Sequence, residues 1–234
     1  PFLPWSPPTS PTPGSRLPTG WANGWTLPTR SRFSRPSTVQ PTPRAAPATA
    51  EHPALRDEFA RVRGALLDSI NTDGVLTPGK ARIRLPAPAW HASTPGAADY
   101  LPYHRYYLAH QRDMGAAIAP LRASVRAGLA QRAPALRQLA ALDGVLDQAL
   151  APRERSLLAT VPQLLGRRFE QLHQAHRGTL PADGADDPAG WLQPGTWLTR
   201  FCHDMKAVLQ AELDLRLQPV AGLLEALNEV TTQP

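Results

Sequence analysis

The stretch TWLTRFCHDMKAVLQAELDLRLQPVAGLLEALNE, residues 196–229, decides the fold because one apolar stripe runs along its whole length. The apolar residues recur in steps of three or four, which is the period of one face of an α-helix. Only Pro219 interrupts the pattern. We therefore expect a long amphipathic helix near 196–229 that packs against other helices. Its stripe consists of Leu198, Phe201, Met205, Leu209, Leu213, Leu217, Val220, Leu224 and Leu227.

Four further segments show the same helical period and are predicted to be helices. They lie near 53–70, 100–131, 134–150 and 152–177. Amphipathic helices joined by short turns bury their stripes against one another. The predicted fold class is therefore all-α, either an antiparallel helical bundle or a stack of elongated helical hairpins.

Two of these segments carry an internal proline, and one carries a leucine stripe. Pro120 and Pro162 each remove an intrahelical hydrogen bond, and we expect Pro120 to kink its helix. The segment near 134–150 is expected to pack through five leucines. They are Leu136, Leu139, Leu142, Leu146 and Leu150.

The connections at 71–99 and 178–195 are rich in Gly and Pro and are predicted to be irregular. The first contains a candidate strand at Arg82–Leu85. In the second, Asp187 is placed to cap a helical turn that begins at Pro188. Residues 51–234 are thus expected to form one helical domain with two irregular connections.

Residues 1–50 differ from the rest in composition. They hold twelve of the 27 prolines and five arginines, and they contain no Asp or Glu. Such a proline density opposes helices and central strands, so we predict a disordered, basic, Pro-rich tail. The other 184 residues carry twenty basic and nineteen acidic side chains, so the net charge of +6 belongs mostly to the tail. Nucleic acid is therefore an unlikely partner for the helical part.

The sequence contains one cysteine, Cys202, and no long uninterrupted apolar segment. A lone cysteine rules out an intrachain disulfide, which fits a reducing compartment. Without an apolar segment of about eighteen residues, membrane insertion is not expected. We therefore expect a cytoplasmic protein.

The common catalytic and phosphate-binding motifs do not occur in the sequence, so no catalytic, cofactor-binding or metal residue is assigned and no enzyme is expected. His173 and His176 lie three residues apart and could hold a metal if His203 or Cys202 completed the site. A polar edge near the end of a helix explains both histidines more simply. Cys202 is expected to be buried beside the apolar stripe.

The densest polar and aromatic cluster is a candidate partner-binding surface, because Tyr and Arg dominate the energetics of protein interfaces. The cluster comprises Tyr100, Tyr103, His104, Arg105, Tyr106, Tyr107 and His110. The candidate partner-binding residues in and beside it are Tyr103, Arg105, Tyr106 and Arg112. In the alternative interpretation, Tyr103 and Tyr107 belong to the core and their neighbours cover the connection at 71–99.

Several long strings resemble a bacterial family, domain of unknown function 3348. They are ALRDEFARVRGALLDSI, YHRYYLAHQRDM, IAPLRASVRAGLA, ATVPQLLGRRFEQLHQAHR and PGTWLTRFCHDMKAVLQAELDLRLQPVAGLLEAL. The resemblance covers about residues 54–229 and implies no reaction, cofactor or catalytic residue. Family members usually begin with an amphipathic helical segment, from which residues 1–50 depart. Residues 15–38, back-translated with one permissible choice of GC-rich codons and read two nucleotides later, give an acidic, helix-periodic string. Residues 1–50 therefore look like an out-of-frame translation. A missing first helix would expose an apolar stripe and favour self-association.

These observations favour a non-enzymatic adaptor or assembly factor that binds another protein. An alternative is a nucleic-acid-associated protein that uses its arginine-rich helix faces, whose affinity would fall steeply with salt. A second alternative is an enzyme with an unrecognised site near the 71–99 connection and the histidines, which would carry a bound metal or metabolite. The partner, the oligomeric state and the pathway are not implied by the sequence.

Overall fold

The computed structural model describes residues 51–88, 98–181 and 186–232. These ranges contain helices and irregular connections and no β-strand, which confirms the all-α fold class. The predicted disordered tail, residues 1–50, lies outside the described residues. The helices are α1 (Glu51–Asn71), α2 (Leu101–Ala130), α3 (Pro134–Leu158), α4 (Val161–Arg177), the short 3₁₀ helix η1 (Pro188–Gly190) and α5 (Trp197–Thr232).

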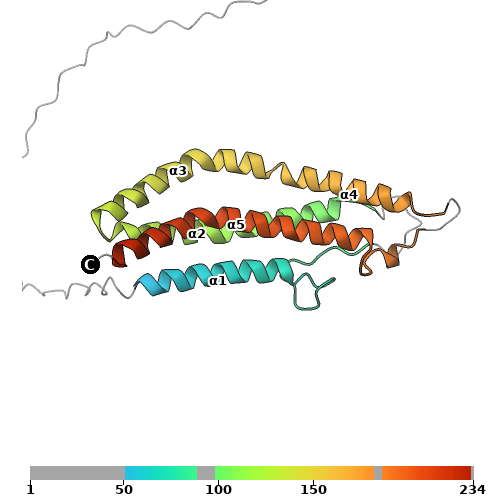
Figure 1. Cartoon of the computed structure of the whole chain (residues 1–234), viewed down its shortest axis with the longest axis horizontal. Coiled ribbons are helices and arrows are strands. Elements are labelled where there is room, and N and C mark those ends of the chain that lie inside the picture. Colours follow the sequence, from blue (N-terminus) through green and yellow to red (C-terminus); the bar gives the residue numbers. More distant parts are fainter. Residues whose placement is uncertain (1–50, 89–97, 182–185, 233–234) are drawn as a thin grey trace, which may run out of the picture. The chain divides into compact units, whose positions relative to one another are not determined.

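The helices form an antiparallel bundle in which α3 and α4 together make one arm (Figure 1). Helices α2 and α5 run in the same direction through the middle of the bundle and contact each other. Helix α1 packs against both on one side, and the arm of α3 and α4 covers them on the other. Both outer arms run antiparallel to the central pair. The end of α1 at Asn71, for example, lies near the first half of α5, where Gln210 donates to Asn71 Oδ1 at 2.8 Å.

The stripes predicted for the two central helices form the core. Each of the nine apolar stripe residues of α5 is buried. The stripe residues of α2 are buried too, and they are Tyr103, Tyr107, His110, Met114, Ile118, Leu121, Val125 and Leu129. Aromatic rings close the end of the core where α2, α4 and α5 meet. There the ring centroid of Phe169 lies 5.6 Å from that of Tyr103, 5.1 Å from that of Phe201 and 5.2 Å from that of Trp197. Such edge-on and tilted pairs add to the stabilisation from burial.

The break between α3 and α4 lies further along the chain than the sequence predicted. Helix α3 continues through Pro152 to Leu158, and the chain turns at Ala159 and Thr160. Pro162 therefore lies in the first turn of α4 and not in the interior of a helix. The backbone N–H groups in the first turn of a helix make no intrahelical hydrogen bond, so proline, which lacks this N–H, is tolerated there. Pro162 therefore fits the start of a helix.

The connection after α1 is irregular over residues 72–88, as predicted, but the candidate strand at Arg82–Leu85 is wrong. A backbone hydrogen bond of 3.0 Å, which the Leu85 amide donates to the Asp73 carbonyl, joins this stretch to the start of the connection. Asp73 also anchors this connection through its side chain. Its Oδ1 accepts from the amides of Val75, Leu76 and Thr77 at 2.7, 2.7 and 3.0 Å.

The turn before α5 confirms the predicted cap. The Asp187 carboxylate accepts from the Ala189 amide at 3.0 Å, and Pro188 begins the 3₁₀ helix η1. Within the described residues, no helix is both long enough and apolar enough to cross a membrane.

Candidate partner-binding surface

Helix α3 turns most of its leucines toward solvent, contrary to the sequence prediction. Of its five stripe leucines, only Leu136 is buried and Leu139 is half-buried. Leu142, Leu146 and Leu150 are 54%, 44% and 57% exposed. The expectation that every amphipathic stripe packs inside the bundle is therefore wrong for α3.

The exposed apolar residues in the middle of α3 form one continuous face. They lie three or four positions apart, so they share one side of the helix. Leu157, which is 57% exposed, extends the face toward the end of α3. We call this surface the outer face of α3 and define it by its central residues. They are Leu142, Val145, Leu146, Ala149 and Leu150.

The outer face carries no charged side chain. Between Arg137 and Arg153 the only charged residues are Asp143 and Asp147. Both face the bundle, because they contact arginines of α2. An uncharged leucine face of this length on solvent is unusual, since exposed helix faces normally carry charged and polar residues.

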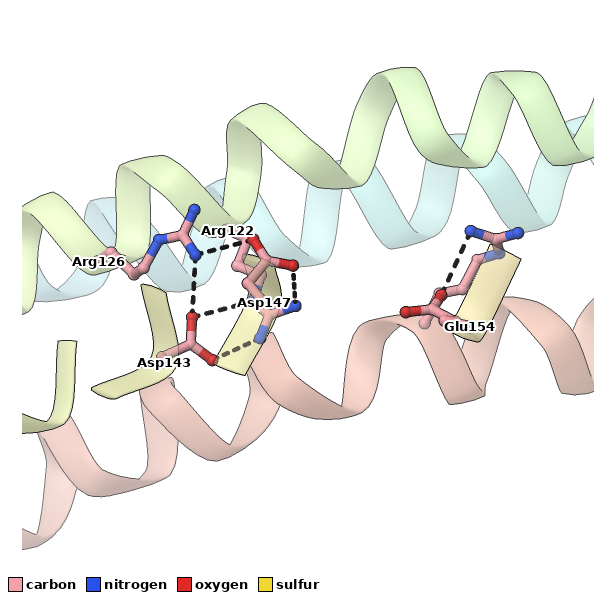
Figure 2. Close-up of polar contacts among 6 residues, drawn as sticks. Arg122, Arg126, Asp143, Asp147 and Glu154 are labelled. Carbon is pink, nitrogen blue, oxygen red and sulfur yellow. Dashed lines mark hydrogen bonds and ion pairs between the residues drawn. The ribbon is translucent and has the colours of Figure 1, made fainter. Parts of the chain in front are cut away.

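Ion pairs join α2 to the side of α3 that packs on it (Figure 2). Arg122 donates two hydrogen bonds to Asp143, one of 2.9 Å from Nε and one of 2.6 Å from a terminal nitrogen. Its other terminal nitrogen lies 2.8 Å from Asp147 Oδ1. Arg126 adds contacts of 2.9 Å to Asp147 and 3.3 Å to Asp143. Two arginines one turn apart thus hold two carboxylates one turn apart.

This network is shielded from solvent. The side chains of Arg122 and Asp143 are only 15% and 11% exposed. The hydrogen bonds that Arg122 donates to Asp143 raise the pKa of its guanidinium above its usual value, although burial opposes the shift. Two-pronged pairs between arginine and carboxylate fix geometry more strictly than single contacts. The network therefore fixes the rotation of α3 about its axis, which leaves the outer face toward solvent.

A second polar group ties the far half of α3 to the central helices. Glu212 of α5 accepts from Tyr107 Oη at 2.7 Å and pairs with Arg216 at 2.7 Å. Arg216 also reaches Glu154 of α3 at 3.5 Å. Gln111 of α2 donates to Glu212 at 3.0 Å and to the carbonyl of Leu158 at 3.2 Å. Both halves of α3 are thus oriented by polar contacts on one side.

The structure does not bring the four sequence-predicted partner-binding residues to one surface. Tyr103 and Tyr106 are each 4% exposed and belong to the core, whereas Arg105 and Arg112 are exposed. The burial of Tyr103 and Tyr107 confirms the core interpretation. The sequence contained a signal that Tyr106 is buried, because Tyr106 lies one helical turn before His110, which belongs to the buried stripe of α2.

Two histidines of the candidate metal site, His176 and His203, line separate hollows. His176 borders a pocket of about 490 Å³ beside Trp191 and Trp197 at the end of α4. His203 borders a different hollow of about 300 Å³. Cys202 is fully buried, as predicted, and burial together with the nearby Asp73 raises the pKa of its thiol to about 12. In the described part of the chain no three such side chains are grouped to hold a metal ion.

Asp186, His176 and Trp191 form one hydrogen-bonded group beside the larger pocket. Asp186 Oδ1 accepts from Trp191 Nε1 at 2.7 Å and lies 3.0 Å from His176 Nε2. These hydrogen bonds hold the pKa of the Asp186 carboxyl below its usual range, although burial opposes the shift. The group orders the turn between α4 and α5, and the outer face of α3 is the stronger candidate for function.

Sequence reasoning missed this surface, although the sequence contained a signal for it. Asp143 and Asp147 interrupt the leucines of α3 at a spacing of one turn, and Arg122 and Arg126 have the same spacing on α2. Matched pairs of opposite charge on neighbouring helices predict which sides face each other.

A model of the family described as "Protein of unknown function (DUF3348)" matches residues 21–229. The match begins upstream of residue 54 and includes residues 21–50, which were expected to depart from the family. A match in this reading frame counts against the out-of-frame interpretation of those residues. No curated protein and no solved structure matches the chain. Since the family match spans most of the sequence, the chain belongs to the DUF3348 family of proteins of unknown function.

Proposed function

We propose that this protein is a non-enzymatic adaptor or assembly factor that binds a helix of another protein on the outer face of α3. The observation that carries the proposal is the exposure of Leu142, Val145 and Leu146, which are 54%, 64% and 44% exposed on one uncharged helix face. Single exposed leucines need no explanation, but a continuous apolar face is typical of an interaction site.

The spacing of the exposed residues supports a helical partner. Positions 142, 145, 146, 149 and 150 repeat every three to four residues, as in the seam between two packed helices. The exposed Ala149, which has a small side chain, leaves room on this face for a second backbone to approach. A helix laid along the face would bury leucines that the bundle leaves in water, and this burial would drive binding.

The test is a pulldown from the native host with the full tagged chain and two variants. Leu146→Asp places a charge at the centre of the outer face, and Leu215→Asp is the matched control because Leu215 of α5 is 51% exposed. Neither substitution disturbs a buried group, so both variants should unfold in urea within about 0.5 kcal/mol of the parent chain.

We expect a stoichiometric protein partner that survives nuclease treatment, is lost with Leu146→Asp and is retained with Leu215→Asp. A partner retained equally by all three chains would contradict the proposal. Loss of every partner on nuclease treatment would instead favour the nucleic-acid alternative.

A further inference from the structure

The acidic side chains of α3 are all engaged on the side that faces the bundle. Asp143 and Asp147 pair with Arg122 and Arg126 of α2. Glu154, the third acid of the helix, pairs with an arginine of α5. These pairs cancel the negative charge of α3 where it meets the bundle, so none of it is available to a partner on the outer side.

The basic side chains of α3 are instead exposed. Arg137, Arg153 and Arg155 are exposed and make no ion pair with any residue that the structure describes. Arg153 lies seven positions after Leu146, which is two helical turns, so it continues the line of the outer face. Arg137 and Arg155 each lie nine positions from Leu146 and so point to the opposite side of the helix. The outer face therefore combines an uncharged leucine centre with the unpaired positive charge of Arg153.

We propose that the segment bound on the outer face is an amphipathic α-helix of another protein that carries acidic side chains beside its apolar stripe. This inference rests on the proposed function and specifies the chemistry of the partner. The apolar stripe would cover Leu142, Leu146 and Leu150. A carboxylate would pair with Arg153 at the end of the leucine contact, where such a charge selects the partner and speeds its approach.

Charge argues against the two occupants that this chain itself could supply. The outer face of a second copy would offer Arg153 no carboxylate, because Asp143, Asp147 and Glu154 are all engaged on the side of α3 that faces the bundle. Residues 1–50 carry five arginines and no acidic residue, so they too repel a basic surface. An acidic helix from another protein meets neither obstacle.

The experiment uses two labelled synthetic peptides of about 20 residues, long enough to form a helix on binding. Both have the same leucine and alanine stripe. One has glutamates at the flanking positions, and the other has lysines at the same positions. Binding to the full chain and to its Arg153→Glu, Leu146→Asp and Leu215→Asp variants is measured by fluorescence anisotropy at low and high salt.

We expect the glutamate peptide to bind and the lysine peptide not to bind. Leu146→Asp should weaken binding at least about tenfold because it buries a charge in an apolar contact. Arg153→Glu should weaken it about three- to tenfold, with an effect that shrinks in salt. Leu215→Asp should bind like the parent chain.

Equal or stronger binding of the lysine peptide, or no binding of either peptide, would overturn the inference. So would sedimentation data at low salt, about 0.1 M, that show a dimer of the chain dissociated by Leu146→Asp. The proposed function fails separately, when the pulldown partner is unaffected by Leu146→Asp. A partner that depends on Leu146 but carries no acidic helix would leave the function standing and refute the inference alone.

Discussion

The imidazole of His110 is 2% exposed and packs edge-on against the ring of Tyr106, with ring centroids 4.6 Å apart. Burial lowers its pKa from 6.5 to about 4, and the positive charges of Arg82 and Lys206 add to the shift. His110 is therefore uncharged in the folded protein at neutral pH, and it gains a proton more readily when the chain unfolds.

This shift predicts acid destabilisation in a defined range. Because the folded-state pKa is lowered, the contribution of His110 is fully present above pH 6.5 and is lost as the pH falls from about 6.5 toward 4. The free energy of unfolding, measured by urea titration at each pH, should fall by an amount on the order of 3 kcal/mol across this range.

His110→Phe removes the titrating group and should flatten the profile over the same range. His203→Gln is the control, because His203 is exposed and its replacement should leave the acid loss in place. An unchanged acid loss in His110→Phe would contradict the assignment.

Asp73 is a second buried titratable residue, and it is charged in the folded protein. Its carboxylate is 0% exposed, accepts three backbone hydrogen bonds and pairs with Lys206. Although burial opposes the shift, these contacts hold its pKa below 3.8, so its contribution is lost at lower pH than that of His110. Asp73→Ala should cost about 3 kcal/mol, since it leaves the ammonium of Lys206 without its carboxylate.

Amide hydrogen exchange distinguishes this local effect from general weakening. In Asp73→Ala, the amides of Val75, Leu76 and Thr77 should exchange much faster than in the parent chain, because they lose their acceptor. Protection of these three amides that is the same in both proteins would show that another group anchors the connection.

At the scale of the element, α3 is set apart by its polar attachment to the bundle. Arg122→Met should lower the free energy of unfolding by about 3 kcal/mol, because it leaves the shielded carboxylate of Asp143 without its main partner. The double change Arg122→Met with Asp143→Leu should recover most of that loss. A double variant as unstable as the sum of the single variants would show that the two side chains do not act as a pair.

The central helices could be predicted from sequence because their stripes are long and have a single interpretation. The stripes of α2 and α5 are buried on all their apolar positions, so periodicity alone gave both the elements and their packing sides. The sequence prediction placed the boundary between α3 and α4 too early, because a proline can lie either inside a helix or in its first turn. Pro152 lies within α3, and Pro162 begins α4.

The packing side of α3 could not be predicted from its leucines. Periodicity tells which residues share a face, but it does not tell which of two possible faces packs inside. Leu142 and Asp143 are adjacent in sequence and point about 100° apart. The pairing of Asp143 with Arg122, a contact between different helices, decides which of them turns inward.

At the scale of the whole molecule, the bundle combines an apolar core with one arm whose apolar face points outward. The same face governs self-association. At low salt the unpaired arginines of α3 should keep copies apart, and salt should both screen them and strengthen apolar contact. Sedimentation equilibrium should therefore show a monomer at about 0.1 M salt and increasing association toward about 1 M. A stable dimer at low salt that dissociates as salt rises would contradict this.

The most direct test of the outer face is site-specific photo-crosslinking in the native host, with the crosslinking amino acid p-benzoylphenylalanine placed at position 146 or 215 of the full chain. The account predicts a crosslink from position 146 to one other protein, at an acidic helix, and none to that protein from position 215. Crosslinks from position 146 to residues 1–50 or to a second copy would show that the chain covers this face itself. That result would contradict the central claim.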